Sequence, residues 1–138
     1  MIPEPLWLDI LANVPVVCVD VVIVRDGKAL LVLRAEHPAK GEWWFPGGRV
    51  LKGEALRQTA HRKALEEVGL NCHVGPMLRL EEMHFDDGDV HSVTACFLLW
   101  PKDDSEVVLD RTCLAGKWVD GLEGMDGYVR ACLGEAGL

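Results

Sequence analysis

Glu66 and Glu67 are adjacent acidic residues that stand just before Gly69. The pattern of the preceding residues places them in the last turn of a helix, where the helix dipole makes each acid unfavourable by about 0.3–1 kcal/mol. Helix stability alone therefore does not explain why two acidic residues stand at this end of the helix. Carboxylate oxygens are the ligands that hard divalent cations such as Mg²⁺ prefer. The pair is a candidate for binding such a cation.

The spacing around these acids separates a binding site from an ordinary polar helix face. On an ordinary face, Arg62 and Lys63 would form ion pairs with the acids four residues later. Here the stretch has set intervals: Gly48, five residues, Glu54, seven residues, Arg62, then Glu66, Glu67, Gly69 and Leu70. A chance match somewhere in the chain has a probability on the order of one in a hundred thousand. The spacing thus favours a functional site.

An aromatic run leads into this stretch, with Trp43, Trp44 and Phe45 followed by Pro46 and the glycine pair 47–48. Glycine lets the backbone come close to an ion and its ligand, and proline stiffens the turn. We expect the aromatic side chains to pack in the core and brace the turn. The alternative is a wall on which a nucleobase stacks.

Helices and a sheet must position these residues. Apolar Leu56, Ala60, Ala64 and Val68, with Leu65 beside them, recur at helical intervals and predict a helix that Gly69 follows. Apolar β-branched runs predict strands, and an Asp-Gly pair predicts a hairpin turn at 25–28. The expected helices are 5–12, 54–68 and 121–133, and the expected strands are 14–24, 29–34, 43–45, 72–85, 90–100 and 117–120, with an acidic loop at 86–89. This order predicts an α+β fold with a sheet between helices.

Composition limits the classes of function. With 138 residues and 49% hydrophobic side chains, we expect a single domain over residues 1–138. A net charge of −8 argues against a nucleic-acid partner, because phosphate neutralisation needs clustered Lys and Arg. No apolar run approaches the length of a spanning helix, so we expect no membrane partner and a cytoplasmic protein. Five cysteines without a Cys-x-x-Cys pair indicate reduced thiols, mostly in the core.

Residues 48–70, GRVLKGEALRQTAHRKALEEVGL, resemble the box motif of the Nudix hydrolase family. The resemblance implies a Nudix-type α/β/α sandwich with a mixed sheet and a small-molecule nucleotide substrate. It also implies one or more Mg²⁺ or Mn²⁺ ions held by glutamates and a loop carbonyl, here Gly47, Glu66 and Glu67. Dimer formation is an expectation at the level of the family. The apolar N-terminal segment suits either a homodimer interface or packing on its own domain.

One position departs from the family pattern. Where the family has a glutamate directly after the arginine, this chain has Lys63. That glutamate is commonly a metal ligand or general base in members that cleave between phosphates. Our hypothesis is that Lys63 contacts phosphate or replaces a second metal. A single-metal site would then consist of Glu67, Glu66 and the Gly47 carbonyl.

Residues 14–100 resemble one branch more narrowly, the GDP-mannose mannosyl hydrolases, which also lack that glutamate. The matching residues are Asp20, Arg34, the stretch HPAKGEWWFPGGRV, HFDD at 84–87 and HS at 91–92. In that branch, water attacks the anomeric carbon of the sugar and the nucleoside diphosphate leaves. The resemblance implies that Arg34 and Arg49 orient or stabilise the diphosphate, that Asp20 contacts the sugar or supports the base, and that His84 lies near the phosphates.

Each of these residues also has a purely structural interpretation. Asp20 would be a hydrogen-bonded acid in an apolar strand, although isolated buried carboxylates are costly enough to favour function. Arg34 would be a surface residue at the end of a strand. His84 and His91 would be surface strand residues.

A second departure concerns the catalytic histidine of that branch. The corresponding stretch 109–120, LDRTCLAGKWVD, has neither histidine nor amide, and the thiol of Cys113 is a poor substitute. Either Asp110, Asp20 or His84 is the base, or attack occurs at phosphorus. The predicted function is Mg²⁺-dependent hydrolysis of a nucleoside diphosphate linked to another moiety, favouring a nucleotide sugar such as GDP-mannose. The alternatives are a nucleoside triphosphate or dinucleotide pyrophosphohydrolase and a non-catalytic sensor of a nucleotide metabolite.

Overall fold

The structure is a computed structural model that describes residues 1–87, 89–125 and 127–138. Its elements, in chain order, are α1 (Glu4–Asn13), β1 (Val16–Arg25), β2 (Lys28–Arg34), β3 (Trp43–Trp44), β4 (Gly47–Arg49), α2 (Leu56–Val68), β5 (Cys72–Phe85), β6 (Val90–Pro101), β7 (Cys113–Val119) and α3 (Gly127–Glu135). The long strands and the first two helices match the predicted ranges to within two residues.

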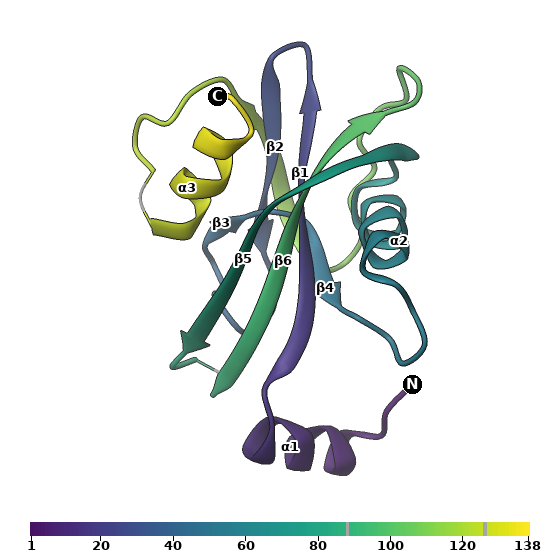
Figure 1. Ribbon diagram of the computed structural model, residues 1–138, viewed down its shortest axis with the longest axis vertical. Helices are drawn as coiled ribbons and strands as arrows, with labels where there is room; N and C mark the ends of the chain where they lie inside the picture. Colours follow the sequence, from purple (N-terminus) through teal and green to yellow (C-terminus); the bar gives the residue numbers. More distant parts are fainter. Residues whose placement is uncertain (88, 126) are drawn as a thin grey trace.

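The strands form one mixed sheet (Figure 1). Its main path runs β3-β2-β1-β6-β5, while β4 pairs with β1 and β7 pairs with β2. β1 and β6 are parallel, from Val16 opposite Ser92 to Ile23 opposite Leu99, and the other pairs are antiparallel. Central β1 is therefore held on both sides, which agrees with its nearly continuous apolar sequence.

Helices cover both faces of this sheet (Figure 1). On one face, Ala60, Ala64 and Val68 of α2 are buried against side chains of β1 that include Val19 and Val21. On the other face, α3 packs through Val129, Cys132 and Leu133 against a second cluster that includes Val22, Leu31, Phe45 and Cys96. This arrangement confirms the predicted α+β fold, an α/β/α sandwich with a mixed sheet between helices.

The turn between β1 and β2 is the predicted hairpin. Asp26 and Gly27 both have positive φ, 54° and 75°. Two such residues are typical of the type I′ turn that joins antiparallel strands.

Three sequence predictions need correction. The sequence pattern predicts that Leu65 belongs to the apolar face of α2, but Leu65 is 49% exposed. The face of α2 that packs on the sheet is formed by Ala60, Ala64 and Val68, and Leu65 points away from it. The last strand begins at Cys113 instead of 117, since it pairs along the length of β2. The last helix begins at Gly127 instead of 121, and Gly124 before it has φ of 78°, outside the helical region. Gly88 of the predicted loop 86–89 and Asp126 of the predicted helix lie outside the described residues.

The N-terminal helix α1 lies across one end of the sheet (Figure 1). None of its residues is buried. In the described ranges, no helix is long and apolar enough to cross a membrane. The five cysteines are free thiols; four are buried and Cys18 is half-buried, as the composition predicted.

Candidate functional site

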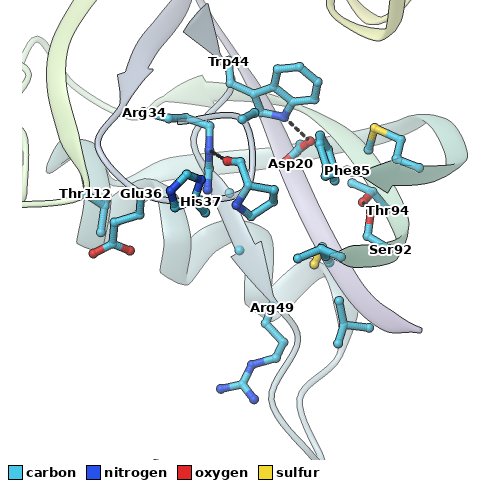
Figure 2. A pocket seen from close by; sticks show the side chains of 18 of the residues that line it. Asp20, Arg34, Glu36, His37, Trp44, Arg49, Phe85, Ser92, Thr94 and Thr112 are labelled. Carbon is cyan, nitrogen blue, oxygen red and sulfur yellow. Dashed lines mark hydrogen bonds between the residues drawn. The ribbon is translucent and has the colours of Figure 1, made fainter. Parts of the chain in front are cut away.

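A cavity of about 530 Å³ opens where β1, β4 and α2 meet, next to α1. Six of the residues singled out from the sequence line it: Asp20, Arg34, Gly47, Arg49, Lys63 and Glu67. Figure 2 shows that Asp20, Arg34 and Arg49 come from three different strands around this space. The pairing of β1 with β4 brings Asp20 directly opposite Gly47, so the sheet itself joins the strand acid to the glycine turn.

Glu67 is held firmly at the wall of this cavity. Its side chain lies in the last turn of α2 and the residue is only 6% exposed. The Gly47 backbone N–H donates to Oε1 at 2.9 Å, and the Thr112 hydroxyl donates to Oε2 at 2.9 Å. These donors fix the carboxylate in one orientation, while the glycine turn brings the backbone to within hydrogen-bonding distance of it.

Lys63 places a positive charge beside this carboxylate. Its Nζ lies 3.4 Å from Glu67 Oε2 and 3.5 Å from Glu66 Oε2. The lysine side chain is mostly buried and also packs over Gly48. The residue that departs from the family pattern therefore lies in the site, next to both predicted acidic ligands.

Arg62 joins the start of α2 to its end. Its Nε and one terminal nitrogen donate to the two oxygens of Glu54 at 2.7 and 2.9 Å. The same guanidinium contacts the Arg49 carbonyl at 3.1 Å and Glu66 at 3.3 Å. Hydrogen bonds from Arg62, and to a lesser extent from Thr59, lower the pKa of Glu54 to about 2 despite the opposing effect of burial. The motif's arginine thus braces the loop that carries the site.

Replacing Arg62 with alanine is expected to lower the free energy of unfolding by about 2 kcal/mol at neutral pH, since it leaves a mostly buried Glu54 carboxylate without its partner. Because the folded-state pKa of Glu54 is depressed, this stabilisation is present above about pH 4.5 and is lost as pH falls toward about pH 2. The difference between wild type and variant should therefore shrink in acid. Urea unfolding across pH measures it. Arg111→Ala is the control, since that side chain is 86% exposed; an equal loss in both variants would contradict the bracing role.

Asp20 is a buried acid with two side-chain donors. The residue is 7% exposed, and its Oδ2 accepts from Trp44 Nε1 at 3.2 Å and from the Tyr128 hydroxyl at 2.9 Å (Figure 2 shows the first of these). Burial raises the pKa of the Asp20 carboxyl to about 7, against the lowering effect of the two hydrogen bonds. Its other oxygen, Oδ1, lies close over Gly47.

This raised pKa gives Asp20 a measurable effect on stability. The folded state binds the Asp20 proton more tightly than the unfolded state does. The resulting contribution of Asp20 to the free energy of unfolding is therefore fully present below about pH 4 and is lost as pH rises through about 7. Relative to Asp20→Asn, which does not titrate, the wild type should lose about 2 kcal/mol of unfolding free energy between about pH 5 and 6.5. Chemical denaturation in the presence of a chelator measures it. Parallel stability curves for the two proteins would contradict the raised pKa.

Two arginines supply further positive charge at the cavity. Arg34, at the end of β2, donates from Nε to the Pro38 carbonyl at 2.5 Å, which holds its guanidinium beside the loop after β2 (Figure 2). Arg49 is the last residue of β4, and its guanidinium lies over the ring of Trp7 of α1, 4.4 Å from the ring centroid. Such a contact orients the arginine while leaving its charge available to a ligand.

Two predicted site residues, His84 and Glu66, are not among the residues that line the cavity. Neighbouring residues of a strand point to opposite faces. Met83 and Phe85 line the cavity, and His84 between them is not among its lining residues and is 68% exposed. Glu66 is half-exposed on α2 and pairs with Arg62, one residue before the buried Glu67. The structure therefore does not bring His84 to this site, and it places Glu66 at the margin.

Two residues that touch the site were missed by sequence reasoning. Thr112, before β7, contacts Glu67, and its hydroxyl also lies 2.5 Å from Asp110 Oδ1. Tyr128, in α3, contacts Asp20 and stacks on Trp44 with ring centroids 5.4 Å apart. Both come from segments far along the chain. Phe45 is fully buried, which confirms core packing for that residue, whereas Trp43 and Trp44 are half-buried against the same core and Trp44 also lines the cavity.

The donor set fits one Mg²⁺ or Mn²⁺ ion. Glu67 presents an oriented carboxylate at the cavity, with Glu66 next to it and Gly47 in contact. The Lys63 ammonium lies against both acids and offsets part of their negative charge, which favours one ion over two at this point. Mg²⁺ is usually bound by one or two carboxylates, with waters and substrate phosphates completing its shell. Glu66 and Glu67 therefore supply enough carboxylate oxygens for a single ion.

The chain matches a family model and is similar in sequence to known proteins. The family model described as NUDIX domain matches residues 14–123. The chain is 42% identical over 92 residues to the low-salt glycan biosynthesis protein Agl8 of Haloferax volcanii, covering 67% of this chain and 59% of that protein. It is 35% identical over 85 residues to an ADP-ribose pyrophosphatase of Methanocaldococcus jannaschii, covering 62% of this chain and 50% of that protein.

A solved structure has a similar fold. The MutT NUDIX hydrolase from Burkholderia pseudomallei superposes with a TM-score of 0.73 at 25% identity, over 88% of this chain and 97% of that chain. The chain thus spans nearly all of this structure but only 59% and 50% of the two curated relatives.

Proposed function

The chain belongs to the Nudix family, and on that premise we propose that residues 1–138 form one Nudix hydrolase domain that acts on a nucleoside diphosphate linked to another moiety. The favoured substrate is a nucleotide sugar such as GDP-mannose, hydrolysed at the anomeric carbon with Mg²⁺ or Mn²⁺. The relative named for glycan biosynthesis supports this substrate class, because glycan synthesis uses nucleotide sugars. Cytoplasmic location and homodimer formation stay predictions.

One observation carries the proposal. A buried, oriented carboxylate, Glu67, shares a single cavity with the cationic side chains of Arg34, Arg49 and Lys63. A cavity of about 530 Å³ lies within the range of small-molecule sites. A diphosphate carries several negative charges, which are neutralised by cationic side chains and by a bound metal ion. Three cationic side chains beside a metal ligand therefore suit a diphosphate.

Each of these side chains has a role in the proposed reaction. Glu67, Glu66 and Gly47 would hold the divalent ion, which when bound grips the diphosphate and stabilises the charge that develops on it. Arg34 and Arg49 orient the diphosphate by hydrogen bonds to its oxygens. Lys63 supplies charge where other family members have a glutamate, and this favours a single ion. Arg62, on the helix, donates a hydrogen bond to the Arg49 carbonyl and so holds the helix against the strand that follows the glycine turn.

Asp20 is the proposed acceptor for the proton of the attacking water. Its carboxyl lies in the cavity wall, and Trp44 and Tyr128 hold it in place through one oxygen. The other candidate bases from the sequence, Asp110 and His84, are less suited. Asp110 already accepts from the Thr112 N–H at 2.8 Å, and the Thr112 hydroxyl oxygen lies 2.5 Å from the same carboxylate oxygen. His84 faces away from the cavity.

Hydrolysis in ¹⁸O-labelled water tests the proposal. The chain is incubated with Mg²⁺ and GDP-mannose, and in parallel with ADP-ribose, and the products are analysed by mass spectrometry. We expect the label in free mannose and none in GDP. A label in a phosphate product would instead establish attack at phosphorus, the pyrophosphohydrolase alternative that the ADP-ribose pyrophosphatase relative supports. Binding without products would favour the sensor and overturn the enzymatic proposal.

A further inference from the structure

The hairpin of β5 and β6 carries a second group of ligand-type side chains, Glu82, His84 and His91. His84 and His91 are directly opposite each other in the antiparallel ladder. Met83, one residue away, lines the cavity, so alternation along the strand places this group on the other face of the sheet. The group is therefore separate from the diphosphate site proposed above.

The separations between these side chains match those of ligands around one ion. Glu82 Oε1 lies 3.4 Å from His91 Nε2 and 3.7 Å from His84 Nε2, and all three ligand atoms lie within 4.8 Å of one another. Tetrahedral Zn²⁺ with bonds of about 2.1 Å holds its ligand atoms about 3.4 Å apart. The two imidazole rings are stacked, with centroids 4.1 Å apart and planes 20° apart. Because a metal ion lies in the plane of each imidazole that binds it, the exposed His84 ring must turn for both Nε2 atoms to bind one ion. The three ligand atoms are thus close enough together to bind one cation once His84 has turned.

Hydrogen bonding does not account for this arrangement. An N–H···O bond is typically 2.7–3.2 Å long, and neither imidazole comes that close to the carboxylate. The Nε2 atom of His91 is itself buried and has no hydrogen-bond partner in the described part of the chain. A buried polar atom without a partner is unfavourable and calls for a ligand. His84 and Glu82 are largely exposed, so an ion can reach the group from solvent.

We propose that Glu82, His84 and His91 bind one Zn²⁺ ion, with water in the fourth position. Imidazole and carboxylate ligands suit Zn²⁺, whereas Mg²⁺ requires an octahedral shell of oxygen. The ion ties β5 to β6 near the hairpin end, where Phe85 and Val90 on the opposite face line the cavity. Zn²⁺ therefore stabilises the strands that form one wall of the catalytic cavity.

Titration with Co²⁺ in excess Mg²⁺ tests this site, since Co²⁺ takes the place of Zn²⁺ and gives visible absorption bands in tetrahedral sites. We expect the wild-type chain to bind one equivalent, with the bands removed by added Zn²⁺. His91→Gln should weaken Co²⁺ binding by about 100-fold or more, because even residues that only orient metal ligands contribute about 10–100-fold. His73→Gln is the control, because His73 is an exposed histidine of β5, the strand that carries Glu82 and His84.

The outcomes are distinct. Loss of binding in His91→Gln and retention in His73→Gln support the site, provided that circular dichroism shows a folded variant. His84→Gln replaces it if folding fails, since His84 is 68% exposed. Equal Co²⁺ binding by wild type and both ligand variants would overturn the proposal. A strong near-ultraviolet thiolate band would do so too, because it would place the ion on cysteine.

Discussion

Glu67→Gln is expected to lower turnover of a nucleotide sugar by at least about 100-fold while the domain stays folded. Glutamine keeps the shape of the side chain, and its carbonyl can still accept the Gly47 N–H that now donates to Oε1. It removes the negative charge beside Lys63 and the proposed ion. The loss should therefore appear in kcat with saturating Mg²⁺, and heat or urea unfolding should show a much smaller change.

Two further variants sharpen this test. Glu123→Gln removes an acid from an exposed loop outside the cavity and should leave turnover unchanged. Glu66→Gln removes the half-exposed acid next to Glu67, and we expect a smaller loss than for Glu67. Wild-type activity in the Glu67 variant would contradict the metal assignment. If both adjacent acids mattered equally, the ion would lie between the two carboxylates and not chiefly at Glu67.

The local parts of this molecule were predictable from sequence because local patterns determine them. The apolar residues of α2 recur at helical intervals, and the Asp26-Gly27 pair specifies its hairpin. The resemblance of residues 48–70 to the Nudix box implied that Glu67 and Gly47 lie together, and the structure has the Gly47 N–H on the Glu67 carboxylate. Short strand β4 was interpreted only as a turn, because three residues carry no periodic signal.

The distant parts of the site could not be predicted in the same way. Thr112 reaches Glu67 across 45 positions, and Tyr128 reaches Asp20 across 108. No local pattern encodes these contacts, because they depend on the order of strands in the sheet and on the packing of α3. His84 illustrates the same limit. Alternation along β5 shows that His84 and Met83 point to opposite faces of the sheet. Only the pairing of β5 with β6, and of β6 with β1, shows which of these faces lines the cavity.

Adjacent glycines of the turn should respond differently to alanine, because their surroundings differ. A Cβ on Gly47 would lie 2.2 Å from Asp20 Oδ1 and 2.4 Å from the Val19 carbonyl oxygen. Both are parts of the central strand that cannot move aside cheaply. Gly47→Ala should therefore lower the free energy of unfolding by about 3 kcal/mol or more, measured by urea denaturation.

Gly48→Ala is the matched comparison. A Cβ there would meet Lys63, with Cε at 2.7 Å and Nζ at 3.1 Å, and the end of a lysine side chain can rotate away. We expect a stability loss below about 1 kcal/mol, together with a displaced ammonium next to Glu67 and weaker binding of the diphosphate. Equal destabilisation by both substitutions would mean that the turn tolerates no side chain at all. The close approach of Gly47 to Asp20 would then not be what requires glycine at that position.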